Sequence, residues 1–202
     1  MSIRVLLADD QALVRGALAA LLRLEDDLDV VAEVGTGDAV LAAAREHEAQ
    51  VCLLDIEMPG KDGIAVAAQL RAELPEVRSL MVTTFGRPGY LRRALEAGAA
   101  GFVVKDTPAT ELADAIRAVH AGRRVVDPTL ATESLTGGPN PLTEREAQVL
   151  RACLDGEPIA TIAGRVHLSQ GTVRNYISSA IGKVGASNRV EAARTADRYG
   201  WL

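Results

Sequence analysis

Acidic, hydroxyl and ammonium side chains close short apolar runs at four points of this 202-residue sequence. Asp9 and Asp10 follow the first run and Asp55 follows a later one, while Thr83 and Lys105 close two more. Three carboxylates suit a hard divalent cation such as Mg²⁺, which prefers oxygen ligands. An Asp carboxylate can accept a phosphoryl group covalently, and a cation, a hydroxyl and an ammonium beside it offset the charge of that group. We therefore predict that Asp55 is a phosphoacceptor.

The apolar runs are spaced as strands that alternate with helices. Each short run is followed by a longer amphipathic stretch, and this repeat occurs five times over residues 1–121. The pattern predicts an α/β fold with a five-stranded, doubly wound parallel sheet. The expected strands span residues 3–8, 30–34, 51–54, 79–83 and 101–104. Ligands bind such sheets at the carboxyl ends of the strands, which is where the acids, the Thr and the Lys all fall.

Two other interpretations of these residues are open. A single Asp in such a position is most often an ordinary strand-end turn residue, but a whole set of reactive groups at one sheet edge argues against that reading. A phosphatase of the haloacid-dehalogenase kind also uses a strand-end Asp. That class needs a second Asp two residues later, where this chain has Glu57. We therefore expect a protein that is not a turnover enzyme.

The strand and helix pattern lapses over residues 122–140, and residues 136–141 are dense in Gly and Pro. This composition predicts an interdomain linker over residues 122–140. Charge also changes along the chain, which has a net charge of −5. Residues 142–202 carry 8 Lys and Arg against 6 Asp and Glu, whereas residues 1–141 carry 14 against 21. An acidic front and a mildly basic tail suggest two domains with different partners.

Residues 141–202 predict a small all-α domain of four helices. Thr143 with Glu146 forms a capping box for the first helix, and Ser169 caps the third. The second and third helices are separated by a short turn, as in a helix-turn-helix. The third presents Arg174 and Asn175, which can pair with guanine and adenine edges. This spacing favours double-stranded DNA as the partner, with a helical interaction module as the alternative.

Composition limits the location of the protein. Apolar residues make up 48% of the chain, and no apolar run approaches the length of a membrane span. The N-terminus lacks the charged segment and apolar core of a signal peptide. We therefore expect a cytoplasmic protein with no membrane partner.

The first 121 residues resemble the receiver domain of two-component response regulators. The resemblance implies that Asp55 is the phosphoacceptor and that Asp9 and Asp10 are the acidic pair that holds Mg²⁺ with it. It further implies that Glu57 offers its backbone carbonyl to the metal and that Lys105 is the phosphate-binding lysine. Thr83 would be the switch hydroxyl and Phe102 the switch aromatic. Ordinary core packing is the alternative reading of Phe102.

The tail resembles a LuxR-type DNA-binding domain. The residues that carry the resemblance include 142–146, Gly156, 162–163, 168–169, 172–174, Gly185 and 189–192. The resemblance implies base or groove contacts from Arg174, Asn175 and Ser178, and phosphate contacts from Thr172 and Lys183. Tyr176 stands where the family usually has His, and Asn175 and Ser178 are less basic than in many relatives.

Together the two resemblances point to the NarL/FixJ class of response regulators. A sensor histidine kinase would phosphorylate Asp55, the domain would dimerise, and two tails would bind a two-fold operator to control transcription. The class accepts and slowly hydrolyses its own aspartyl phosphate. The alternative is a regulator that works without phosphorylation. The presence of Asp9, Asp10, Thr83 and Lys105 argues against that alternative. Residues 83–91 resemble regulators of membrane-lipid desaturation, the DesR-like subgroup.

The first and fifth helices are the preferred dimer face. Both carry stripes of apolar residues that we expect to be exposed, although core packing explains part of each stripe. The stripes consist of Leu13, Ala17 and Leu21 on the first helix and Leu112, Ile116 and Val119 on the fifth.

Overall fold

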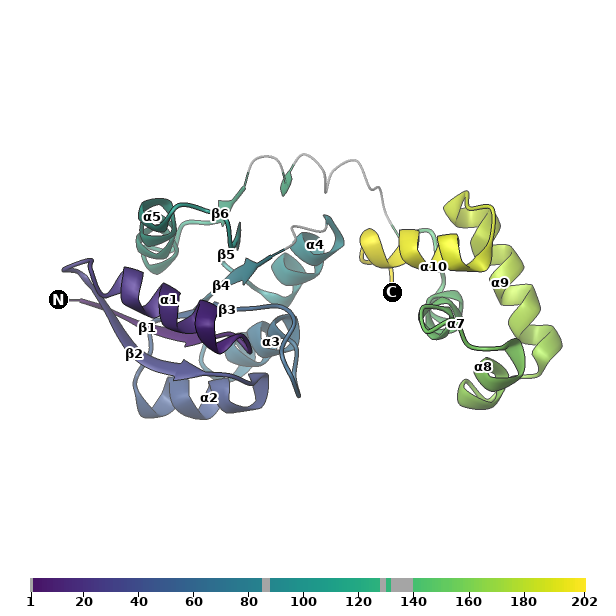
Figure 1. Cartoon of the computed structure of the whole chain (residues 1–202), viewed down its shortest axis with the longest axis horizontal. Helices are drawn as coiled ribbons and strands as arrows, with labels where there is room; N and C mark the ends of the chain where they lie inside the picture. The colour runs from purple at the N-terminus through teal and green to yellow at the C-terminus, as the bar shows by residue number, and fades with distance from the viewer. Residues whose placement is uncertain (1, 85–87, 128–129, 132–139) are drawn as a thin grey trace. The chain divides into compact units, whose positions relative to one another are not determined.

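The computed structural model describes residues 2–84, 88–127, 130–131 and 140–202. The chain divides into two compact units, of which the first reaches Ala131 (Figure 1). The first unit is an α/β sheet domain, and the second is built of helices. Within the described residues, no helix combines the length and the apolar character needed to cross a membrane.

The first unit is organised around a parallel sheet. Among the described residues the sheet has six strands in the order β2-β1-β3-β4-β5-β6, and every neighbouring pair is parallel. The strands are β1 (Ile3–Ala8), β2 (Leu28–Val34), β3 (Val51–Leu54), β4 (Arg78–Thr83), β5 (Gly101–Val104) and β6 (Val125–Val126). β1, β3, β4 and β5 occupy the interior of the sheet, which explains why most of their residues are buried and most are apolar.

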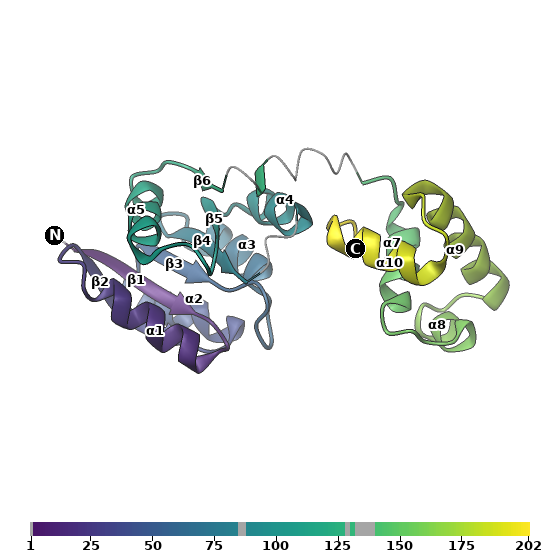
Figure 2. The ribbon, with the colours of Figure 1, turned by 45° about the horizontal axis from the view of Figure 1, so that its top comes forward.

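Helices cover both faces of the sheet, as a doubly wound fold requires. They are α1 (Ala12–Leu22), α2 (Gly37–Glu46), α3 (Gly63–Glu73), α4 (Pro88–Ala97) and α5 (Ala109–His120). Figure 2 shows α1 and α5 on one face and α2, α3 and α4 on the other. The buried side chains of α1 and α5 form one apolar cluster with the strands beneath them. The predicted α/β fold is therefore confirmed.

The predicted strand number is wrong by one. β6 pairs in parallel with β5, with Gly101 opposite Val125 and Phe102 opposite Val126. This strand falls inside the stretch expected to be a linker, so the sheet continues past residue 121. Two residues are too few to produce a strand period in the sequence, which explains why the pattern did not reveal it.

The expected exposure of the fifth helix is also wrong. Its stripe lies in the core, because Leu112, Ile116 and Val119 are at most 4% exposed and pack against the sheet. The stripe of α1 behaves as expected, since Leu13 is 87% exposed and Leu21 is 43% exposed. α1 instead reaches the core through Ala19 and Leu22, which lie on its opposite side.

The second unit is all-helical over residues 140–202, which are all described. It consists of α7 (Glu144–Cys153), α8 (Ile159–Arg165), α9 (Gln170–Val184) and α10 (Arg189–Arg198). The predicted capping box at Thr143 and Glu146 is confirmed, and so is the cap at Ser169, whose hydroxyl accepts the Thr172 amide. The apolar faces of the four helices form a separate core.

Candidate functional site

The backbone brings the carboxyl ends of the strands to one edge of the sheet. The Asp55 amide donates to the Ala8 carbonyl over 2.8 Å, which sets Asp55 beside the end of β1. The Lys105 amide donates to the Thr83 carbonyl over 2.8 Å, which joins the ends of β4 and β5 in the same way. These bonds extend the parallel ladders by one residue, so the side chains that follow each strand share one edge.

Carboxylates gather at this edge around one ammonium. Asp9, Asp10 and Asp55 each present an oxygen, and these oxygens lie within 4.8 Å of one another. The Nζ of Lys105 lies 2.7 Å from Asp9 Oδ2 and 2.9 Å from Asp55 Oδ2. Asp9 and Asp55 are buried and Asp10 is exposed, so the cluster opens to solvent on the Asp10 side.

Burial and charge shift the pKa values of two groups in this cluster. Burial raises the pKa of Asp55; Lys105 counters part of the rise and the neighbouring Asp9 adds to it, so the pKa lies above its usual value. Burial lowers the pKa of Lys105, but its bonds to Asp9 and Asp55 outweigh this, and its pKa is raised. Lys105 therefore stays charged, and its charge favours the anionic form of Asp55 against the effect of burial.

The donor set fits a Mg²⁺ ion. Three carboxylates face one ammonium, which leaves an excess of negative charge where hard oxygen ligands converge. Mg²⁺ prefers one or two carboxylates together with waters and phosphate oxygens, and an exposed Asp10 leaves room for such waters. The residues that would hold the ion are Asp9, Asp10 and Asp55. The contribution of the Glu57 carbonyl stays a prediction.

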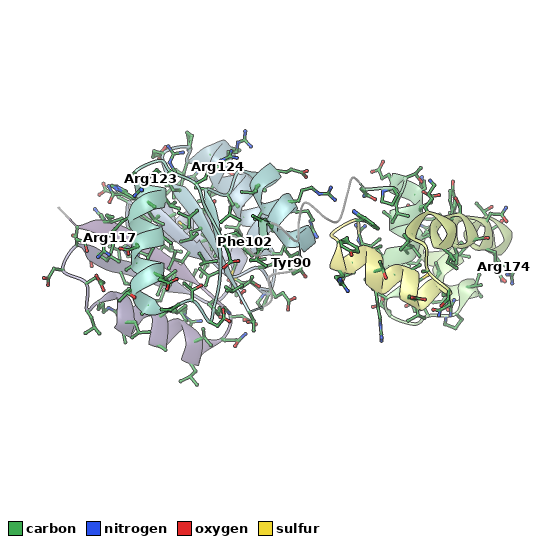
Figure 3. The ribbon with its side chains drawn as sticks, turned by 90° about the horizontal axis from the view of Figure 1, so that it is seen from above. Tyr90, Phe102, Arg117, Arg123, Arg124 and Arg174 are labelled. Atoms are coloured by element: carbon green, nitrogen blue, oxygen red, sulfur yellow. The ribbon has the colours of Figure 1, made fainter. Side chains whose placement is uncertain are left out.

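Thr83 and Phe102 lie on the neighbouring strands β4 and β5. Thr83 ends β4 and is 4% exposed, next in the sheet to the strand that carries Phe102. Phe102 is fully buried within the first unit, where Figure 3 labels it. Complete burial agrees with a core residue and leaves its switch role a prediction.

Two residues that the sequence analysis did not single out also hold the acidic cluster. The amide of Gln11, which caps α1 by position, donates to Asp9 Oδ1 over 2.9 Å. Arg15 reaches back from α1 and donates to the Asp9 carbonyl. Both connect α1 to the acidic edge. Their only sequence signal is nearness to Asp9, which does not predict a contact.

In the second unit, α9 presents a polar face to solvent. Arg174, Asn175 and Ser178 are exposed, while Val173 and Ile177 are buried on the opposite side. Figure 3 shows Arg174 projecting away from the other helices of this unit. α9 contains Arg174 and Lys183 and no Asp or Glu. Such a face has the charge and the donors that a DNA groove requires.

The two residues expected to contact phosphate are engaged within the protein. The Thr172 hydroxyl lies 2.8 Å from the Ser169 hydroxyl. The Lys183 ammonium lies 2.7 Å from Glu146 Oε2 on α7. Tyr176 is half-buried and packs against the core of the unit.

Known proteins resemble the chain over its whole length. Residues 5–117 match the response regulator receiver domain, and residues 140–196 match the bacterial regulatory proteins of the luxR family. The chain is 42% identical to the transcriptional regulatory protein DesR of Bacillus subtilis, over 99% of each protein. It is 44% identical to the response regulator RamR of Streptomyces coelicolor, over 98% of each.

The crystal structure of the response regulator ChrA, from a heme-sensing two-component system, is also similar. It is 32% identical with a TM-score of 0.61, over 100% of this chain and 99% of ChrA. The similarity to DesR fits the predicted subgroup, and the identity to RamR is about as high. With a receiver domain and a LuxR-type tail both matched, the chain belongs to the DNA-binding response regulators of two-component systems.

Proposed function

We propose that Asp55 receives a phosphoryl group from a phosphohistidine of a sensor kinase. An oxygen of the Asp55 carboxylate forms a bond to phosphorus while the phosphorus–nitrogen bond breaks and the imidazole leaves with the electron pair. Lys105 lies 2.9 Å from Asp55 and offsets the charge on the incoming phosphoryl oxygens. When bound by Asp9, Asp10 and Asp55, Mg²⁺ supplies further charge neutralisation.

The same site works as a switch and not as a turnover catalyst. Asp55 is 5% exposed, so the acyl phosphate it forms is shielded from bulk water and is hydrolysed slowly. Thr83 at the end of β4 donates its hydroxyl to the new phosphoryl oxygens. Its movement leaves space that Phe102 on β5 occupies, and the surface near α4 and β5 changes shape.

Dimerisation through α1 links the switch to assembly. Leu13, Ala17 and Leu21 form an exposed apolar stripe at helical spacing, and Leu24, 79% exposed, continues it past the end of the helix. A second copy of the chain is a suitable occupant, because a two-fold interface places the same stripe on both sides. Gln11 and Arg15 tie this helix to Asp9, so a change at the acidic edge reaches the stripe.

The fifth helix contributes polar groups beside this stripe. Arg117, which is labelled on α5 in Figure 3, pairs with Glu25 and Asp27 in the turn after α1, at 2.6 Å to each. These pairs hold the two helices as one surface. The proposed dimer face therefore combines an apolar α1 with a charged α5, in place of two apolar stripes.

In the proposed complex, α9 enters the major groove of an operator. Arg174, Asn175 and Ser178 contact base edges there, as their exposure on one helix face supports. Two tails of a dimer bind half-sites that lie one helical turn apart or a multiple of it. Because its partner is chromosomal DNA, we infer that the protein works in the cytoplasm.

The contact of Lys105 with both Asp9 and Asp55 at one sheet edge carries this proposal most directly. Its test is labelling with a small phosphodonor and Mg²⁺, followed by mapping of the modified residue by mass spectrometry. Wild-type protein and Asp106→Asn, which alters an exposed carboxylate next to Lys105, should be labelled at Asp55. Asp55→Asn should not be labelled, and a label that persists on another carboxylate would remove Asp55 from the role.

A further inference from the structure

A buried carboxylate joins α7 to the helix that carries the proposed DNA contacts. Glu146 lies in the first turn of α7, and its side chain is 4% exposed. Oε2 accepts the Thr143 amide and the Lys183 ammonium, each over 2.7 Å, and Oε1 accepts the Ser179 hydroxyl over 2.7 Å. Two of these three donors come from α9, so both oxygens of one α7 side chain are bound to α9.

The two donors lie where they fix the rotation of α9. Ser179 and Lys183 are four residues apart and share one face of the helix. Ser179 directly follows Ser178 and lies one turn after Asn175, both proposed to contact DNA. Glu146 and Thr143 also line one groove with four residues of α9, namely Thr172, Asn175, Tyr176 and Ser179. A turn of α9 about its axis would break both bonds to Glu146 and move the contact residues together.

The charge of Lys183 is neutralised inside the protein. Burial raises the pKa of Glu146, but the bonds from Lys183, the Thr143 amide and Ser179 outweigh burial and lower the pKa to about 2. Glu146 is therefore an anion at neutral pH, and its partner is the Lys183 ammonium at 2.7 Å. Glu146 is the buried member of this pair and the Lys183 side chain is 37% exposed, so removal of Lys183 leaves a buried carboxylate without its cation.

We propose that Glu146 positions α9 for sequence reading, and that Lys183 binds Glu146 in place of a DNA phosphate. The inference rests on the proposed role of α9 in DNA reading and revises the expected role of Lys183. Glu146 does more than cap α7, because the capping box uses only the Thr143 amide and hydroxyl. Gln serves equally well at this position of a capping box. The Glu146→Gln substitution therefore keeps the cap and removes the charge that holds Lys183.

The salt dependence of DNA binding shows whether Lys183 binds Glu146 or contacts a DNA phosphate. Each phosphate contact adds about 0.9 to the slope of log affinity against log salt concentration. The experiment measures affinity over a range of KCl concentrations for two duplexes of equal length. One is an operator fragment selected from random-sequence DNA with the phosphorylated protein, and the other is its scrambled sequence. Circular dichroism confirms that each variant is folded.

Lys183→Gln should leave the salt slope unchanged and lower the operator-to-scrambled affinity ratio about tenfold, which is the discrimination that one good base contact supplies. Glu146→Gln should lower the ratio to a similar degree. Because it frees the Lys183 ammonium, it should also steepen the slope on scrambled DNA by about one per bound protomer. Ser179→Ala, which removes one α9 donor without changing charge, should lower the ratio in the same direction.

Glu144→Gln is the matched control, because Glu144 is an exposed acid in the same turn of α7. It should keep the wild-type ratio. A shallower slope with an unchanged ratio in Lys183→Gln would show that Lys183 contacts phosphate and would overturn the inference. Wild-type ratios in Glu146→Gln and Ser179→Ala would overturn it as well. A wild-type protein that fails to distinguish the two duplexes would overturn the proposed DNA reading by α9 itself.

Discussion

Removal of the Lys105 ammonium should destabilise the first unit and strengthen its response to Mg²⁺. The Lys105→Met substitution keeps the aliphatic stem but leaves Asp9 and Asp55, which are 5% and 6% exposed, without their shared cation. Loss of one partner from a buried ion pair costs about 3–5 kcal/mol. The loss of stability has an upper limit, because one of the two carboxylates can take up a proton instead of remaining as an unpaired anion. Protonation of a carboxylate with an ordinary Asp pKa costs about 4 kcal/mol at pH 7. We therefore expect a loss of about 3 kcal/mol in the free energy of unfolding at pH 7.

The penalty should depend on pH with a definite sign. In the variant, the two carboxylates repel each other without Lys105, which raises a carboxylate pKa in the folded state above the unfolded value. The folded state then binds more protons, so the variant is more stable at low pH and loses stability as pH rises through that folded pKa. The deficit relative to wild type should shrink by up to about 1.4 kcal/mol for each pH unit below 7.

Native-state hydrogen exchange of peptides from β1 and β3 isolates the stability of this unit from that of the tail. Mg²⁺ should restore more stability to Lys105→Met than it adds to wild type, because the ion need not share the carboxylates with an ammonium. The matched control is Lys61→Met, which removes an exposed ammonium and should change stability by less than about 0.5 kcal/mol. Equal stability of Lys105→Met and wild type in EDTA, or an equal response to Mg²⁺, would show that Lys105 does not neutralise these carboxylates.

Three further perturbations test other parts of the molecule. Leu13→Glu, at a position 87% exposed, should leave phosphorylation intact and prevent the rise in mass that light scattering detects on phosphorylation; an undiminished rise would exclude the α1 stripe as the dimer face. Arg174→Ala should weaken operator binding by about 1–3 kcal/mol, and unchanged affinity at all salt concentrations would remove Arg174 from the reading face. The pKa of Glu146 is lowered to about 2, so its stabilisation of the tail is present above about pH 4.5 and lost as pH falls toward 2. Fluorescence of Trp201, the sole tryptophan, should report that loss on acidification, and Glu146→Gln should show less of it.

The acidic edge of the sheet could be predicted from the sequence because its signals are local to each strand. A buried run followed at once by a charged residue marks a strand end, and parallel strands bring such ends together. Asp9, Asp55 and Lys105 accordingly meet in one cluster. The helix cap could be predicted for the same reason, because Thr143 and Glu146 have the residue types and the three-residue spacing of a capping box.

Other features have no local signal. An apolar stripe does not reveal which side of its helix meets the sheet, so Leu21 on α1 is exposed while Ile116 on α5 is buried. The pairing of Glu146 with Lys183 joins residues 37 positions apart, and only the packing of α7 on α9 brings them together. β6 is too short to show a period, and its pairing with β5 depends on where the chain returns after α5.

In the proposed mechanism, phosphorylation of Asp55 raises the occupancy of operator DNA. The most direct test measures occupancy of a selected operator fragment before and after treatment with a small phosphodonor and Mg²⁺, in wild type and in Asp55→Asn. Treatment should raise occupancy by wild type and leave that of Asp55→Asn at its untreated level. An equal rise in both proteins, or no rise in a wild-type protein labelled at Asp55, would contradict the account.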